Sequence, residues 1–176
     1  ANKLNGTISS AIGQATNLEY IEIASNCLTG TIPTTIGLLS GLIQKSFADN
    51  QLTSKLPIEM INIVTLQTIK LHTNQFTGSI PSQLFLLPFL KLVFLYKNQL
   101  SGTMPHTLTL NTMLQELDIN NNYFTAETVN IVRPDHLNPW TNDGASQTQT
   151  LAAELPAEYR FSEPVFRIKP QYQYFD

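Results

Sequence analysis

Apolar residues recur along the first 125 positions with a period of 24, and asparagines mark the same point of every period. Each of these six asparagines is followed two residues later by Leu or Phe: Asn2, Asn26, Asn50, Asn74, Asn98 and Asn122. A fixed period in the range of roughly 20 to 29 residues, with a leucine-rich segment before each asparagine, predicts a solenoid. We therefore expect each period to form one coil, with a short strand and a return path.

Six columns of apolar residues become visible when the repeats are aligned on the asparagines. Three columns precede the asparagine and predict the inward face of a parallel strand: Leu18, Leu42, Leu66, Leu90 and Leu114; Ile21, Lys45, Ile69, Val93 and Leu117; Ile23, Phe47, Leu71, Leu95 and Ile119. Three follow it and predict the return path: Leu4, Leu28, Leu52, Phe76, Leu100 and Phe124; Ile8, Ile32, Leu56, Ile80 and Met104; Ile12, Ile36, Met60, Leu84 and Leu108. Each buried side chain contributes about 1.5–3 kcal/mol, so stacked coils supply the stability that one coil lacks.

Polar and special residues at the turns predict a structural role. An asparagine amide offers one acceptor and two donor hydrogens, so a column of asparagines can satisfy backbone groups where successive coils bend. Glycines recur after the asparagine, at Gly6, Gly30, Gly78 and Gly102, while Ser54 and Ala126 interrupt that column. Prolines then begin the next segment with a fixed φ, at Pro33, Pro57, Pro81 and Pro105.

Two segments carry a family resemblance. LTGTIPTTIGLL at 28–39 and FTGSIPSQLFLL at 76–87 resemble the plant-type leucine-rich repeat, whose pattern is LxxLxLxxNxLxGxIPxxIGxL. The resemblance covers about residues 1–125. It implies a right-handed horseshoe or superhelix with a concave parallel sheet and a convex side of short helical or irregular segments. Such repeats occur in plant receptor kinases, polygalacturonase inhibitors and large algal families, and they mainly bind proteins, peptides or small hormones.

Lys45 departs from this pattern, because it occupies a column otherwise filled by Ile, Val and Leu. Burying an unpaired ammonium group is expensive. We therefore expect the Lys45 side chain to extend to an edge of the sheet or to meet an acidic partner, with Asp49 and Glu22 nearest in sequence.

The beginning of the chain is a second departure. Ala1 falls inside a repeat, and no capping segment with paired cysteines precedes it, as secreted plant members usually have. We expect that further repeats precede this end or that another subunit covers it, and that any targeting segment has been removed or lies outside the sequence.

The period stops after Phe124, and residues 126–176 are predicted to form a cap and an extended tail rich in proline and aromatic residues. All three arginines lie there, and so does the whole net charge of −3, since six lysines balance six acids before it. We expect a cap up to about Trp140 and partner contact beyond it. The aromatic residues predicted to contact a partner are Tyr159, Phe161, Phe166, Tyr172, Tyr174 and Phe175.

Composition excludes several classes of protein. A pI near 5.6 without a basic stripe argues against nucleic-acid binding. The longest apolar stretch, from Leu84 to Tyr96, is shorter than the roughly 20 residues of a membrane-spanning helix. Cys27 is the single cysteine, so no internal disulfide or cysteine metal cluster is expected.

Asn5 begins the one N-x-S/T motif and is a possible glycosylation site, and we favour an extracellular or organelle-lumen location over the cytoplasm.

The predicted concave face carries a mixed patch at its centre. Aromatic and donor side chains fall on adjacent strands there, as in many protein interfaces: Lys70, His72, Leu92, Phe94 and Tyr96. Ordinary solvent exposure is the alternative interpretation of the same residues.

Enzymatic motifs are absent from the sequence. His72, His106 and His136 lack motif spacing, and Cys27 has no evident base. Glu116 and Asp118 share a strand face, where two exposed carboxylates commonly only increase solubility. We therefore predict no enzyme, no metal site and no cofactor.

An ice-binding surface is a further alternative. A regular column of hydroxyl groups could order water: Thr29, Thr53, Thr77, Ser101 and Thr125. Lys55 interrupts the neighbouring column of Thr31, Ser79 and Thr103, and the family pattern uses these positions for the turn, so the structural interpretation is favoured.

Two hypotheses of function follow from these patterns. In the first, the chain is a non-enzymatic protein-interaction subunit or scaffold whose solenoid is a rigid surface and whose tail docks onto a larger, multi-subunit assembly. In the second, it is a receptor- or inhibitor-type recognition module that binds a peptide, protein or glycan on the concave sheet. Both predict protein partners, and the sequence leaves the oligomeric state open.

Overall fold

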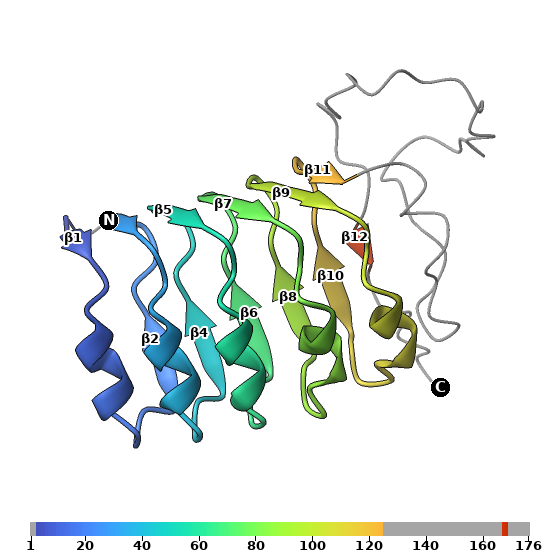
Figure 1. The fold of residues 1–176 in the computed structure, drawn as a ribbon, viewed down its shortest axis with the longest axis horizontal. Coiled ribbons are helices and arrows are strands. Elements are labelled where there is room, and N and C mark those ends of the chain that lie inside the picture. Colours follow the sequence, from blue (N-terminus) through green and yellow to red (C-terminus); the bar gives the residue numbers. More distant parts are fainter. Residues whose placement is uncertain (1–2, 125–166, 169–176) are drawn as a thin grey trace, which may run out of the picture.

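The computed structural model describes residues 3–124 and 167–168 as a stack of near-identical coils (Figure 1). In each full coil a strand of one sheet leads through the asparagine turn into a strand of a second sheet, and a 3-10 helix closes the coil. The first sheet, here called the β2–β10 sheet, contains β2 (Tyr20–Glu22), β4 (Gln44–Ser46), β6 (Thr68–Lys70), β8 (Leu92–Phe94) and β10 (Glu116–Asp118). The helices are η1 (Ser10–Gln14), η2 (Thr34–Leu38), η3 (Ile58–Asn62), η4 (Ser82–Leu86) and η5 (His106–Leu110).

The strands of the β2–β10 sheet are parallel and in the register that the repeat alignment predicts. Ile21 pairs with Lys45, Lys45 with Ile69, Ile69 with Val93, and Val93 with Leu117. The prediction of a leucine-rich repeat solenoid is therefore confirmed, with neighbouring coils one strand spacing of about 4.8 Å apart.

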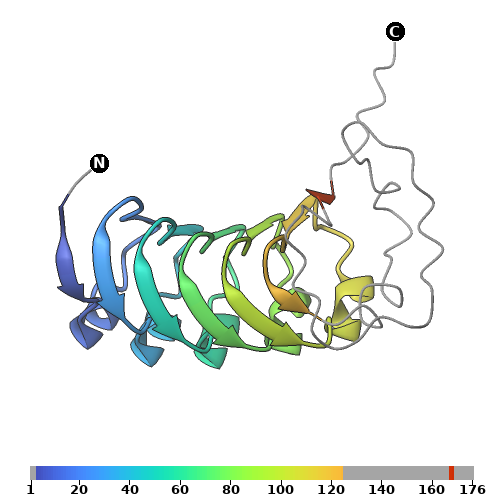
Figure 2. The same cartoon turned by 90° about the horizontal axis from the view of Figure 1, so that it is seen from above.

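A second parallel sheet lies in the return path, which the sequence did not predict. Its strands are β1 (Asn5–Thr7), β3 (Cys27–Gly30), β5 (Gln51–Ser54), β7 (Gln75–Gly78), β9 (Gln99–Gly102) and β11 (Tyr123–Phe124), and they pair in that order. Each strand from β3 to β11 has only one inward aliphatic or aromatic residue, and β1 has none, so no alternating pattern marks them. Figure 2 shows these strands following one another along the stack.

The core lies between the two sheets and the helices, and the predicted columns fill it, except that Leu4 is 52% exposed in the first described coil. Leu42, Leu66, Leu90 and Leu114 are buried, as are Phe47, Leu71 and Leu95 in the third strand column. Proline occupies the position just before η2, η3, η4 and η5, with φ between −67° and −58°. Proline favours the start of a helix because its φ is already set.

The asparagines form a hydrogen-bonded ladder that joins each coil to its neighbours. Asn74 Oδ1 accepts from the backbone N–H of Leu52 at 3.0 Å. Its Nδ2 donates to the carbonyls of Leu71 (3.2 Å) and His72 (3.3 Å) in the same coil and of Phe47 (2.9 Å) in the preceding one. The same four bonds recur at Asn50, Asn98 and Asn122. The predicted structural role is confirmed for the described asparagines, and Asn2 lies outside the described residues.

The turn itself uses the left-handed backbone region at two places. The residue before each described asparagine has a φ between 51° and 56°, although none is glycine: Ser25, Asp49, Thr73, Lys97 and Asn121. Ser54, which interrupts the glycine column, takes the same conformation as the glycines, with φ 75° against 74–86°. The backbone path is therefore kept where the sequence departs from the pattern.

The prediction for Lys45 is wrong. Its side chain is 0% exposed, and Nζ has no hydrogen-bond partner within the described part of the chain. The strand register places Lys45 between Ile21 and Ile69 on the inward face, so its chain cannot reach the edge, and Glu22 points outward into solvent. Burial lowers the pKa of Lys45 well below its usual range because desolvation penalises the charged form.

Part of the tail returns to the first sheet. β12 (Arg167–Ile168) pairs antiparallel with the outer edge of β10, with Ile168 opposite Leu117 and Arg167 opposite Asp118. The predicted cap at 126–140 and the six predicted tail contact residues lie outside the described residues.

Replacing one ladder asparagine should destabilise the protein strongly. Asn74→Ala leaves the Leu52 N–H without its acceptor and removes one of the two hydrogen bonds that each of three carbonyls accepts, and we expect a loss of about 2–4 kcal/mol in the free energy of unfolding. Urea unfolding followed by circular dichroism measures it. Asn62→Ala is the matched control, because Asn62 lies at the end of η3 outside the ladder and should change stability by less than about 0.5 kcal/mol. Equal losses in the two variants would contradict the ladder.

Lys45→Met should stabilise the protein by about 2 kcal/mol or more, since it replaces an unpartnered buried amine with an apolar chain. In the folded state the Lys45 pKa is lowered, so between that pKa and about 10.4 the unfolded state binds one more proton. Stability therefore falls by about 1.4 kcal/mol per pH unit as pH decreases through that window, and becomes constant below it.

Unfolding titrations from pH 6 to about pH 10.5 test this slope in the wild type and in Lys45→Met. The variant should lack the component from Lys45, whereas Lys55→Met, at an exposed position, should retain it. If the stability of the wild type and of Lys45→Met changed with pH in the same way, the pKa of Lys45 would be the same in the folded and unfolded states, and the prediction would be contradicted.

Candidate functional site

The outward side chains of the β2–β10 sheet form two rows that cross neighbouring strands. In the first row Lys70 pairs in register with Phe94, and Phe94 with Asp118. In the second row, two residues further along, are His72 and Tyr96. Backbone bonds continue past the strand ends, from Leu71 N–H to Phe94 O (2.9 Å) and from Thr73 N–H to Tyr96 O (2.9 Å), which fixes both rows.

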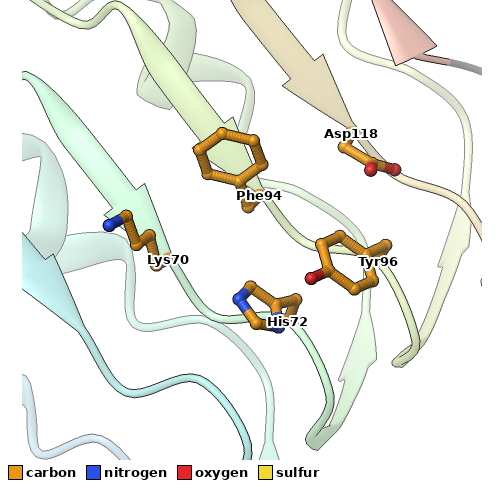
Figure 3. A pocket seen from close by; sticks show the side chains of 5 residues that line it. All are labelled: Lys70, His72, Phe94, Tyr96 and Asp118. Carbon is orange, nitrogen blue, oxygen red and sulfur yellow. The ribbon is translucent and has the colours of Figure 1, made fainter. Parts of the chain in front are cut away.

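These five residues line a hollow of about 440 Å³, here called the central pocket: Lys70, His72, Phe94, Tyr96 and Asp118. Figure 3 shows Phe94 between Lys70 and Asp118, with His72 beside Tyr96 in the next row. Four of the five residues in the patch anticipated from the sequence thus come together. Leu92, the fifth, is half-buried at the start of β8 and does not line the pocket.

His72 and Tyr96 form a stacked pair within the pocket. Their ring centroids are 4.3 Å apart with an interplanar angle of 4°. His72 Nδ1 lies 3.3 Å from Thr73 Oγ1 and 4.0 Å from the Asp49 carboxylate. The stack gives the pocket a flat aromatic wall with a polar edge, a surface that commonly contributes to binding energy.

The charges around His72 compete, and burial has the largest effect. Desolvation lowers the pKa of His72, Asp49 and Asp118 raise it, and Lys70 and Lys97 lower it. The net direction is downward from the usual value near 6.5, so the imidazole is neutral at pH 7.

Asp118 is a site residue that the sequence analysis did not include. It was interpreted there as one of two exposed, solubilising carboxylates, but it is 9% exposed, and its Oδ1 accepts from the Asn120 N–H at 3.1 Å. The repeat places Asp118 in the same column as Lys70 and Phe94, but its burial depends on the neighbouring strand and turn and could not be counted from the period.

The other candidate residues lie apart from the pocket. Asn5 and Cys27 are exposed on β1 and β3 of the second sheet, and His106 is exposed in η5. Within the described residues no three His, Cys, Asp or Glu side chains gather where a metal ion could bind. Nor does any helix there combine the length and hydrophobicity needed to cross a bilayer.

Hydroxyl groups of the second sheet donate hydrogen bonds to carbonyl groups at the turns of neighbouring coils. Thr29 Oγ1 donates to the Gly6 carbonyl (3.3 Å), and Thr53 Oγ1 to the Gly30 carbonyl (3.2 Å). These bonds join neighbouring coils and favour the structural interpretation over an ice-binding surface.

Comparison with known proteins identifies the repeat. The leucine-rich repeat family matches residues 17–39. The receptor kinase HAESA of Arabidopsis, in complex with the peptide hormone IDA and the co-receptor SERK1, is 31% identical with a TM-score of 0.70, over 78% of this chain and 24% of that one. The chain is a plant-type leucine-rich repeat protein.

Two further structures extend the similarity of this leucine-rich repeat protein. PEPR1 in complex with AtPEP1 is 31% identical over 70% of this chain and 18% of that one, with a TM-score of 0.69. The BIR3–SERK2 complex of Arabidopsis thaliana is 29% identical over 70% of this chain and 65% of that one, with a TM-score of 0.64. No curated protein sequence matches the chain. The chain spans about a fifth of the length of several receptor structures that it matches.

The pKa of His72 should respond in opposite directions to two substitutions. Tyr96→Ala removes the stacked ring that shields the imidazole, so the pKa should rise, whereas Asp49→Asn removes a carboxylate that favours the imidazolium, so it should fall further. NMR titration of the His72 ring protons measures both. Shifts of the same sign would contradict the assignment of burial as the main cause.

Proposed function

We propose that this chain is a non-enzymatic protein-interaction module that binds a peptide or protein segment at the central pocket. The observation that carries the proposal is the concentration of aromatic surface on rigid, in-register strands: the stacked His72–Tyr96 pair beside Phe94. Aromatic anchors of this kind dominate binding energy in protein interfaces, and a preorganised surface loses little entropy on binding.

The polar side chains of the pocket would orient a bound segment. Lys70 stands on one side of Phe94 and Asp118 on the other, so the pocket has a basic and an acidic side. A bound segment would place an apolar side chain against Phe94 and Tyr96 and hydrogen-bonding groups toward Lys70 and His72. A neutral imidazole can donate and accept, which suits backbone amides as well as side chains.

The similar structures support a binding role of this kind. HAESA is described in complex with a peptide hormone, and PEPR1 in complex with AtPEP1. Two others are described as ectodomains, which supports the extracellular or lumenal location favoured from the sequence. Docking of the aromatic tail onto a larger assembly stays a hypothesis, because it depends on residues outside the described part of the chain.

A peptide-selection experiment tests the proposal directly. A phage-displayed library of random peptides is selected on the immobilised wild-type chain, and Kd values of enriched peptides are measured by calorimetry. Phe94→Ala should weaken binding by about 2 kcal/mol, roughly thirtyfold, and Phe94→Ala combined with Tyr96→Ala should abolish it.

Tyr20→Ala is the matched control for this experiment. Tyr20 is an exposed aromatic residue on the same face of the same sheet, but on β2, two strands from the nearest strand of the pocket. Its removal should leave Kd unchanged. Peptides that bind all three variants equally, or no enrichment at all, would show that the central pocket is ordinary exposed surface.

A further inference from the structure

Large apolar side chains are exposed together where the last two 3-10 helices end and lead into the following loops. Four of them form what is here called the apolar edge: Leu86 (52% exposed), Phe89 (51%), Leu110 (61%) and Met113 (41%). Leu86 and Leu110 end η4 and η5, and Phe89 and Met113 follow in the loops that lead to β8 and β10. These pairs occupy equivalent positions in adjacent coils, so they lie side by side.

Earlier coils lack this surface at the same positions. The positions equivalent to Phe89 and Met113 are Asn17, Gly41 and Thr65. Leu38, which is equivalent to Leu86, is exposed, but Gln14 and Asn62 occupy the matching positions of the two adjacent coils. A single exposed leucine is ordinary, but a contiguous apolar surface usually has an occupant.

The direction of β12 points to that occupant. β12 is antiparallel to β10, with Arg167 opposite Asp118 and Ile168 opposite Leu117. The direction of β12 therefore runs from the level of Asp118 to the level of Leu117, and the loop that carries Met113 precedes β10 on that same side. Figure 1 shows β12 beside β10, whose lower end leads back to the last 3-10 helix.

The length of this terminal segment fits the distance. Ile168 pairs with Leu117. In the sequence, Tyr172 follows Ile168 by four residues, and Met113 precedes Leu117 by four residues. Pro170 has no N–H and cannot donate to a strand ladder, which favours a segment that leaves the sheet after β12. At about 3.3 Å per residue, residues 171–176 reach roughly 20 Å, which is several times the coil spacing of about 4.8 Å.

We propose that the apolar edge is the docking surface of the chain's own C-terminal segment, residues 170–176. The segment PQYQYFD offers Tyr172, Tyr174 and Phe175 to Leu86, Phe89, Leu110 and Met113. Aromatic side chains have apolar area to cover the edge, and burying one such side chain contributes about 1.5–3 kcal/mol. The segment thus closes the last coil of the stack, and its aromatic residues are engaged within the chain rather than with a larger assembly.

Photo-crosslinking in the full chain tests this docking. p-Benzoylphenylalanine is placed at Tyr174, the protein is irradiated, and adducts are mapped by mass spectrometry. We expect adducts within residues 82–90 and 106–114. An equal mixture of ¹⁵N-labelled and unlabelled chains separates contacts within one chain from contacts between two copies.

Two substitutions give the result its specificity. Phe89→Asp should lower the yield of these adducts about tenfold, whereas Leu38→Asp, at a somewhat more exposed position outside the edge, should leave it unchanged. Melting temperatures of both variants confirm folding. Adducts that join labelled to unlabelled chains, adducts elsewhere on the solenoid, no adducts, or equal effects of the two substitutions would each overturn the proposal.

Discussion

The asparagine ladder is the interaction on which the rest of the structure depends. Each asparagine amide joins two neighbouring coils. Its oxygen accepts a hydrogen bond from a backbone N–H of the preceding coil, and its nitrogen donates to carbonyls in its own coil and in the preceding one. The residue before each asparagine is held in a left-handed conformation that costs about 1–2 kcal/mol for a non-glycine residue. Four hydrogen bonds per asparagine, buried from water, offset that cost and set every coil at the same bend.

A fixed bend gives the site its geometry. Because coils are in register, side chains from β6, β8 and β10 line up across the sheet, and Phe94 lies between Lys70 and Asp118. The backbone bonds that continue beyond the strand ends hold His72 against Tyr96. The same ladder that stabilises the solenoid therefore preorganises the central pocket, and a ligand would meet a surface already in its binding conformation.

Lys45 shows how a repeat protein tolerates one polar residue in an apolar column of its core. Each coil contacts only its neighbours, so a buried amine between Ile21 and Ile69 affects one region of the stack and leaves the rest intact. The register is determined by the asparagines and by the other columns, and one wrong residue in one column cannot shift it. Backbone constraint here outweighs the preference of a single side chain for water, and burial lowers the pKa of the amine because desolvation penalises its charged form.

The sequence by itself determined the period, the coil boundaries, the inward columns and the structural asparagines, because all of these repeat and each depends on neighbours at a constant spacing. It also brought together four of the five pocket residues, since outward positions on adjacent strands can be counted from the asparagines. Only the tertiary structure decided the second sheet, the burial of Lys45, the role of Asp118 and the place of β12. Those features depend on backbone pairing between coils and on how deeply a particular side chain is covered, and residues distant in sequence supply both.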